Sequence, residues 1–212
     1  MKKAMLAGLV LFGTSFFAEA ATLHRWPLDY FAPTTYSRWY DHNHSTGSTR
    51  RYDASTNRLN EDEHHGTDIL GNISPTYIRS GAWGSLYYGL NSCNDNEGIY
   101  STCGGGYGNH VRIFHNDGSG RVTIYAHMLK GTVVGPMSIL CGGTVGLMGN
   151  SGASTGTHLH MEIWTSRYVS PASPHTDRLD LFGGPGNTSS TGSFWVAQNG
   201  TNAPAYPSLS CQ

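Results

Sequence analysis

The chain has 212 residues, of which 13% are charged, and its formal net charge is −1 at pH 7. This length suits a single domain. A charge so close to zero excludes a strongly basic protein that binds nucleic acid through its phosphates, so we expect no nucleic-acid partner.

The first twenty residues have the pattern of a secretory signal peptide. Lys2 and Lys3 precede an apolar run from Ala4 to Phe17, and Ala18-Glu19-Ala20 provides small residues at the cleavage positions. A buried N-terminal helix is the alternative, but the charged start and the small-residue ending disfavour it. We therefore expect residues 1–20 to be removed and the protein to be secreted, to the periplasm or the extracellular medium. No second long apolar run follows, so we expect no transmembrane segment in the mature chain.

Strand signals dominate the middle of the chain, where helix signals are scarce. The runs Val111 to His115 and Arg121 to His127 are of β type, and a glycine-containing turn at 116–120 separates them. In the second run apolar side chains occupy alternate positions, which predicts a half-buried strand. Thr144 to Met148 and His158 to Trp164 have the character of further strands.

We expect one domain over residues 21–169, with its core running from about Trp26 to Val169, and a C-terminal extension over 170–212. The extension is rich in Pro, Gly, Ser, Thr and Asn. Such a composition predicts an irregular or partly mobile segment that packs on the domain and is tied back through Cys211.

The four cysteines are even in number and stand in a chain that we expect to be secreted, so disulfides are the default interpretation. Cys93 and Cys103 bracket a polar loop, and pairing them leaves Cys141 with Cys211. Three pairings are possible, and the sequence does not choose among them. A cysteine-based zinc site is disfavoured because the chain has no C-x-x-C pair.

Two short segments carry groups at metal-ligand spacing. His64 and Asp68 lie four residues apart across a turn in which Gly66 would let the chain bend. On a strand, His158, His160 and Glu162 would share one face. Two histidines and one carboxylate leave a fourth position for water, which is typical of a catalytic zinc site. His127, at the end of its predicted strand, could reach that water.

Each of these patterns is weak by itself, because the chain has eleven histidines. A second HxH, at residues 42–44, lies among polar residues with no strand pattern, and His65 has the wrong parity to join His64. The sequence Gly152-Ala153-Ser154-Thr155-Gly156 formally matches the G-x-S-x-G elbow of serine hydrolases. A β-type run follows it where such enzymes have a helix, so we disfavour that interpretation.

Taken together, the motifs resemble those of the M23 metallopeptidases, the lysostaphin-like cell-wall endopeptidases. The resemblance covers roughly residues 60 to 165, and it is carried in order by the following segments: His64-x-Gly66-x-Asp68, Gly106-Tyr107-Gly108-Asn109, Tyr125-Ala126-His127-Met128, Gly149-Asn150-Ser151-Gly152, and Ser154-Thr155-Gly156-Thr157-His158-Leu159-His160-Met161-Glu162. Two positions depart from the family pattern: Thr157 replaces the usual proline before the HxH, and Met161 replaces a common phenylalanine.

The resemblance implies a mainly β fold, in which antiparallel sheet builds a groove of the lysostaphin-like (duplicated hybrid motif) type with long loops. It implies a Zn²⁺ ion held by His64, Asp68 and His160, and a catalytic pair, His127 and His158, around the bound water. The implied reaction is hydrolysis of peptide bonds in peptidoglycan cross-links, so a peptidoglycan peptide is the expected substrate.

Some questions remain open at this level. Either His127 or His158 could act as the general base, because the glutamate of H-E-x-x-H peptidases is absent. Glu162 could orient His160 or could be solvated. Two other functions remain as alternatives: a protease of the same mechanism that cleaves exposed or glycine-rich proteins, and a non-catalytic wall-binding protein on the same fold.

Overall fold

The computed structural model describes residues 24–31, 36–38, 40–41, 48–50, 56–59, 64–182, 194–195 and 208–211. The expected signal peptide and the HxH at residues 42–44 lie outside these ranges. Within them, the structure has no helix with the length and apolar character that crossing a membrane requires.

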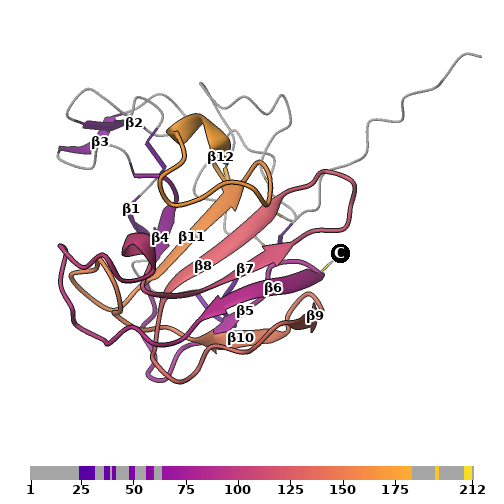
Figure 1. Cartoon of the computed structure of the whole chain (residues 1–212), viewed down its shortest axis with the longest axis horizontal. Helices are drawn as coiled ribbons and strands as arrows, with labels where there is room; N and C mark the ends of the chain where they lie inside the picture. Colours follow the sequence, from indigo (N-terminus) through magenta and orange to yellow (C-terminus); the bar gives the residue numbers. More distant parts are fainter. Residues whose placement is uncertain are drawn as a thin grey trace, which may run out of the picture.

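Antiparallel β-structure dominates the described residues, as predicted (Figure 1). The main sheet runs in the order β1-β4-β11-β8-β7-β6-β9, with β12 paired to β11. Its strands are β1 (Tyr36–Arg38), β4 (Thr67–Ile69), β6 (Gly84–Leu90), β7 (Asn109–Phe114), β8 (Val122–Met128), β9 (Met137–Ile139), β11 (Leu159–Trp164) and β12 (Arg178–Leu179).

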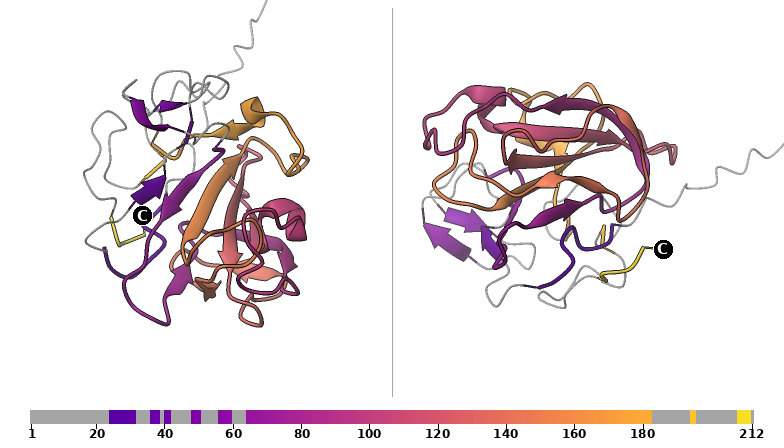
Figure 2. Two further views of the ribbon diagram at one scale, coloured as in Figure 1. Left: turned by 90° about the vertical axis from the view of Figure 1, so that its left-hand side faces the viewer. Right: turned by 90° about the horizontal axis from the view of Figure 1, so that it is seen from below.

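Two smaller sheets accompany the main one. One pairs β5 (Tyr77–Arg79) with β10 (Thr144–Leu147), and the other pairs β2 (Ser48–Arg50) with β3 (Thr56–Leu59). The helical elements of the described chain are two single-turn 3₁₀ segments, η1 (Cys103–Gly106) and η2 (His175–Asp177). Figure 2 shows the twist of the main sheet, which follows from the right-handed twist of its strands.

The main sheet is buried on both faces at its centre. One face packs on a large cluster that includes Ile78 of β5 and Val145 of β10, and on that side lie Leu159, Met161 and Ile163 of β11. The opposite face of β8 and β11 packs on a second cluster, which contains Tyr107, Val122, Ile124, Ala126, Trp164 and Val169. The prediction that the strand ending at His127 is half-buried is therefore wrong, because all seven residues of β8 are buried.

The C-terminal part of the chain contributes to the same core. Leu179, Leu181, Phe182, Phe194 and Trp195 all join the large cluster, so the core extends beyond Val169, where the sequence suggested that it would end. Disulfides link Cys93 to Cys103 and Cys141 to Cys211. The second of these bonds ties the last described residues to the domain.

Candidate metal centre

The first histidine and the aspartate come from β4 and the residues just before it, and they lie beside β11. In the antiparallel register of these strands, His160 is opposite Asp68 and Met161 is opposite Thr67. Asp68 and His160 are therefore cross-strand neighbours on one face. His64 precedes β4 by a short turn, and its ring lies edge-on to that of His160, with a centroid distance of 5.0 Å.

The chain bends at Gly66, as predicted, and this glycine also permits the close approach of β11. Its φ is not positive, so the backbone conformation at this position does not itself require glycine. A Cβ atom at this position would instead lie 2.4 Å from the carbonyl oxygen of Met161 and 2.9 Å from Nε2 of His160. Glycine is required here because β11 leaves no room for a side chain.

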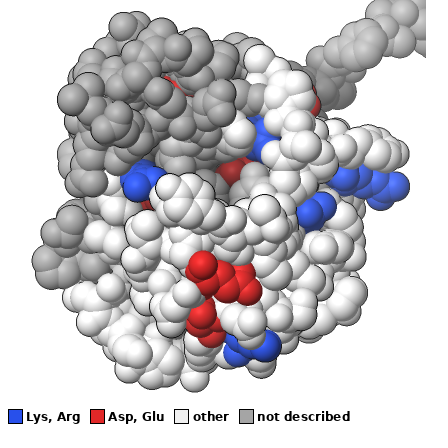
Figure 3. Space-filling view, turned by 60° about the vertical axis from the view of Figure 1, so that its left-hand side comes forward, with Lys and Arg blue, Asp and Glu red and all other residues white. Residues whose placement is uncertain are grey.

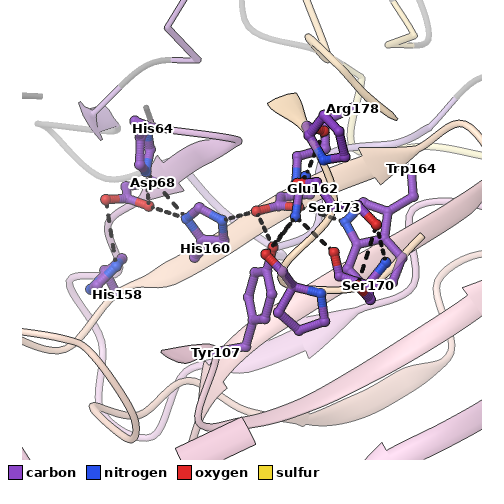
Figure 4. A network of polar contacts seen from close by, with 12 residues as sticks. His64, Asp68, Tyr107, His158, His160, Glu162, Trp164, Ser170, Ser173 and Arg178 are labelled. Atoms are coloured by element: carbon purple, nitrogen blue, oxygen red, sulfur yellow. Dashed lines mark hydrogen bonds and ion pairs between the residues drawn. The ribbon is translucent and has the colours of Figure 1, made fainter. Parts of the chain in front are cut away.

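The potential ligand atoms of His64, Asp68 and His160 converge (Figure 4). Nδ1 of His160 lies 2.8 Å from Oδ1 of Asp68, and Nε2 of His64 lies 3.1 Å from the same oxygen and 3.2 Å from that Nδ1. These residues form a group with metal-binding spacing, in which Asp68 and His160 are buried. Two imidazole nitrogens and a carboxylate oxygen are a donor set that suits zinc.

The electrostatics of this group favour a positive charge between Asp68 and His160. Burial alone would lower the pKa of His160, but its hydrogen bonds with Asp68 and Glu162 raise the pKa to about 10. Burial would raise the pKa of Asp68, yet the neighbouring His64, His158 and His160 hold it well below its usual range. A site that stabilises a proton between these groups is also suited to a metal cation.

Glu162 is buried and hydrogen-bonded to His160. Of the two roles expected for it, the structure therefore shows the partner of His160 and not the solvated side chain. Its Oε1 atom lies 2.8 Å from Nε2 of His160. Burial opposes ionisation of this carboxyl, but the hydrogen bond with His160 and the positive charge of Arg178 outweigh it and lower its pKa to about 2. An ionised carboxylate only accepts hydrogen bonds, so Nε2 of His160 carries the hydrogen and Nδ1 faces the other two potential ligands.

His127 reaches the site through a β-bulge that the sequence did not reveal. With strict alternation, the side chain of His127 would lie on the same face of the sheet as Tyr125, which packs on the large cluster. Ala126 and His160, which are opposite each other on β8 and β11, lie on the other face. The register between β7 and β8 shifts at this point, and His127 has a φ of 57°. The extra residue of the bulge therefore turns its ring toward the site, where its centroid lies 4.7 Å from that of His158 and 5.7 Å from that of His160.

His127 and His158 are both oriented by backbone carbonyl groups. Nδ1 of His127 lies 2.8 Å from the carbonyl oxygen of Ser151, and Nδ1 of His158 lies 2.7 Å from that of Gly156. A carbonyl oxygen accepts only, so each Nδ1 carries the hydrogen and each neutral ring keeps its lone pair on Nε2. Nε2 of His158 lies 3.5 Å from Oδ2 of Asp68. Burial and the neighbouring His158 and His160 lower the pKa of His127 to about 3.

The loop before β11 is held in place by Ser151. Its hydroxyl donates to the carbonyl oxygen of Met128, at 2.7 Å, and accepts the amide hydrogen of Asn109, at 2.9 Å. By contrast, the hydroxyl of Ser154, the serine of the G-x-S-x-G match, is bound to the carbonyl oxygen of Gly156. The strand β11 follows it, and the helix that a serine hydrolase requires is absent from this described segment.

The potential ligands and both catalytic candidates line one groove of about 460 Å³. Figure 3 shows this hollow, with part of an acidic residue visible inside it. His65 lines the groove but does not belong to the group of potential ligands. Sequence reasoning assigned no role to two further residues near the site, Tyr107 and Arg178. Tyr107 lies in the segment Gly106-Tyr107-Gly108-Asn109, and Arg178 is the only lysine or arginine after Arg167.

A family model and several solved structures are similar to this chain. The sequence model of peptidase family M23 matches residues 63–171. A zinc-containing peptidase from Vibrio cholerae is similar in structure, with 23% identity, coverage of 73% of this chain and 40% of that one, and a TM-score of 0.44. The present chain therefore spans less than half the length of that protein.

Two shorter structures are also similar. For the catalytic domain of the antimicrobial peptidase lysostaphin from Staphylococcus simulans, identity is 22%, coverage is 68% of this chain and 86% of that one, and the TM-score is 0.45. For a variant of the catalytic domain of the prophage-encoded M23 protein EnpA from Enterococcus faecalis, identity is 21%, coverage is 72% and 95%, and the TM-score is 0.45.

Proposed function

Because this chain belongs to peptidase family M23, we propose that it is a secreted zinc metalloendopeptidase that hydrolyses peptide bonds in the cross-links of bacterial peptidoglycan. One observation carries the proposal. The ligand atoms of His64, Asp68 and His160 lie within 3.2 Å of one another in a groove that also contains His127 and His158.

In this proposal, His64 binds zinc through Nε2, Asp68 through its carboxylate and His160 through Nδ1. Three protein ligands leave a fourth position for water or substrate, as catalytic zinc sites require. Bound zinc supplies a Lewis acid that polarises the scissile carbonyl and lowers the pKa of bound water to about 7.

His127 and His158 are the residues that transfer protons when the peptide bond is cleaved. Their Nδ1 atoms are held by the carbonyl groups of Ser151 and Gly156, so in the neutral rings both Nε2 atoms are available as bases. One takes the proton of the attacking water, and a protonated imidazole delivers a proton to the departing amine. The carbonyl anchors fix the tautomers and prevent the rings from turning away between turnovers.

Two of the segments that line the groove are hydrogen-bonded to each other. The amide of Ala153 donates to the carbonyl oxygen of Gly106 at 2.8 Å, so the stretch 105–107 and the loop 153–158 adjoin. The two disulfides support a secreted location, because such bonds persist in oxidising compartments.

Mass spectrometry of fragments released from purified peptidoglycan tests the proposal. We expect new peptide termini from cleaved cross-links, their disappearance when a chelator removes the metal, and their return when zinc is added. A parallel digest of a glycine-rich protein examines the related protease function. If the protein substrate is cut and peptidoglycan is not, the enzyme is instead a protease that acts on glycine-rich proteins. Release that persists in the chelator would contradict a metal-dependent reaction.

A further inference from the structure

Arg178 is a fully buried charge that lies next to the site but outside the segment that the family model matches. It stands in β12, which pairs with the end of β11, whereas the family match ends at residue 171. Its side chain is 0% exposed. A buried guanidinium is costly unless its hydrogens and its charge are all partnered, so its surroundings indicate what it does.

The Arg178 guanidinium is surrounded by acceptors from three directions (Figure 4). Its Nε atom donates to Oε2 of Glu162 at 3.1 Å, and one terminal nitrogen lies 3.4 Å from the hydroxyl oxygen of Tyr107. The remaining hydrogens are directed to backbone carbonyl oxygens of the preceding loop, those of Ser170, Pro171, Ser173 and Pro174, at 2.7 to 3.2 Å. The loop thus forms a polar cage that fixes Arg178 against the carboxylate of Glu162.

Both carboxylate oxygens of Glu162 accept two hydrogen bonds each, and these four bonds fix the orientation of the side chain. Oε1 accepts from the hydroxyl of Tyr107 at 2.7 Å and from Nε2 of His160 at 2.8 Å. Oε2 accepts from Nε1 of Trp164 at 2.6 Å and from Nε of Arg178 at 3.1 Å. Four donors leave the carboxylate no freedom to rotate, so the hydrogen bond to His160 has one geometry.

We propose that Arg178 is a positioning residue of the metal centre, which acts on His160 through Glu162. The guanidinium holds the carboxylate, the carboxylate holds the Nε2 hydrogen of His160, and the ring thereby presents Nδ1 toward His64 and Asp68. The inference rests on the proposed function, because it assumes that these three residues bind a metal. It makes the segment 170–179 part of the site rather than an appendage to the domain.

A lysine could not take the place of this residue. Arg178 satisfies acceptors in three directions with a planar, rigid fork of five N–H groups, whereas a lysine ammonium has three hydrogens on a flexible stem. Loss of a partner that orients a metal-binding histidine typically lowers metal affinity tenfold to a hundredfold. We expect Arg178→Met to fall in that range for zinc.

The test measures zinc dissociation constants by competition with a chromophoric chelator, and records the Co²⁺ absorption spectrum, which reports ligand geometry. The proteins are the wild type, Arg178→Met, Glu162→Gln and the double variant. If Arg178 acts through Glu162, the double variant loses no more affinity than Glu162→Gln alone. Additive losses would overturn the inference, and so would a zinc affinity of Arg178→Met within twofold of the wild type.

The matched control is Arg112→Met. The guanidinium of Arg112 stacks on the ring of Trp164, at 4.8 Å, but makes no hydrogen bond with Glu162. We expect its zinc affinity and Co²⁺ spectrum to match those of the wild type, and a loss equal to that of Arg178→Met would overturn the inference. If Arg178→Met does not fold, Arg178→Lys replaces it, and a folded Arg178→Lys with wild-type zinc affinity would equally refute the need for the guanidinium.

Wild-type protein that binds no zinc would instead contradict the proposed function. The wild-type measurement therefore distinguishes failure of the proposed function from failure of the inference about Arg178.

Discussion

Gly66→Ala should damage the proposed metal centre although it replaces none of the proposed ligands. The added Cβ would lie 2.4 Å from the carbonyl oxygen of Met161, 2.8 Å from Cγ of Glu162 and 2.9 Å from Nε2 of His160. The first of these atoms belongs to the backbone of β11, so it cannot rotate away. β4 must therefore move from β11 by about 1 Å to restore ordinary contact, a displacement larger than the roughly 0.5 Å that a functional site tolerates.

The expected cost follows from this overlap. Overpacking in a dense interior destabilises a protein by about 1–3 kcal/mol. For a chain of this size, each kcal/mol lowers Tm by about 2–4 °C, so we expect a fall of roughly 2–12 °C. Zinc affinity should fall as well, because the shift separates Asp68 of β4, and His64 just before that strand, from His160 of β11.

Thermal unfolding of the metal-free protein and zinc competition measure the two effects. Gly135→Ala is the matched control, because a Cβ there meets nothing within 4 Å and its φ is not positive. It should leave Tm unchanged or slightly raised. A Gly66→Ala protein with the Tm and zinc affinity of the wild type would refute the close-approach explanation of this glycine.

Three further predictions concern other parts of the molecule. His127→Ala should retain zinc but lose most peptidase activity, which metal analysis and a turnover assay together would show; normal turnover would remove His127 from the mechanism. Burial lowers the pKa of His110 to about 4. Between about pH 6.5 and 4, this histidine is therefore protonated in the unfolded chain but neutral in the folded chain. Stability should therefore be unaffected by this group above pH 6.5 and fall by up to about 3 kcal/mol as the pH drops toward 4, and His110→Gln should remove that part of the pH dependence of denaturant unfolding. Replacing Cys141 and Cys211 by serine should lower the free energy of unfolding by about 4 kcal/mol, because the bond closes a loop with a sequence separation of 70; an unchanged denaturation midpoint would show that the segment is held by packing alone.

The strands with regular patterns were predictable from the sequence, and the short ones were not. The predicted runs at 111–115, 121–127, 144–148 and 158–164 correspond to β7, β8, β10 and β11, within one or two residues at each end. β4, β5, β9 and β12 have two or three residues each, which is too few to display a period. β6 has seven residues but was also not predicted, because its register shifts between Leu86 and Tyr88 and its burial does not alternate beyond that point. Their pairing depends on contacts with distant strands that no local pattern encodes.

The potential metal ligands could be identified because their spacing is local, whereas the geometry that supports them is not. His64 and Asp68 are four residues apart, and His158 and His160 stand in one HxH. The bulge that turns His127 toward the site depends on the register with β7, and Arg178 reaches Glu162 only through the fold. One signal for Arg178 was present in the sequence: it is a solitary cation in a segment that is poor in charge. The structure places it at the start of the unexpected strand β12, directly before Leu179.

Metal analysis of the purified protein and its ligand variants tests the central claim most directly. The wild type should contain one zinc ion per chain after dialysis, and His64→Ala, Asp68→Ala and His160→Ala should each contain none while remaining folded. One equivalent of zinc retained by Asp68→Ala and His160→Ala would contradict the assignment of these residues as the metal centre.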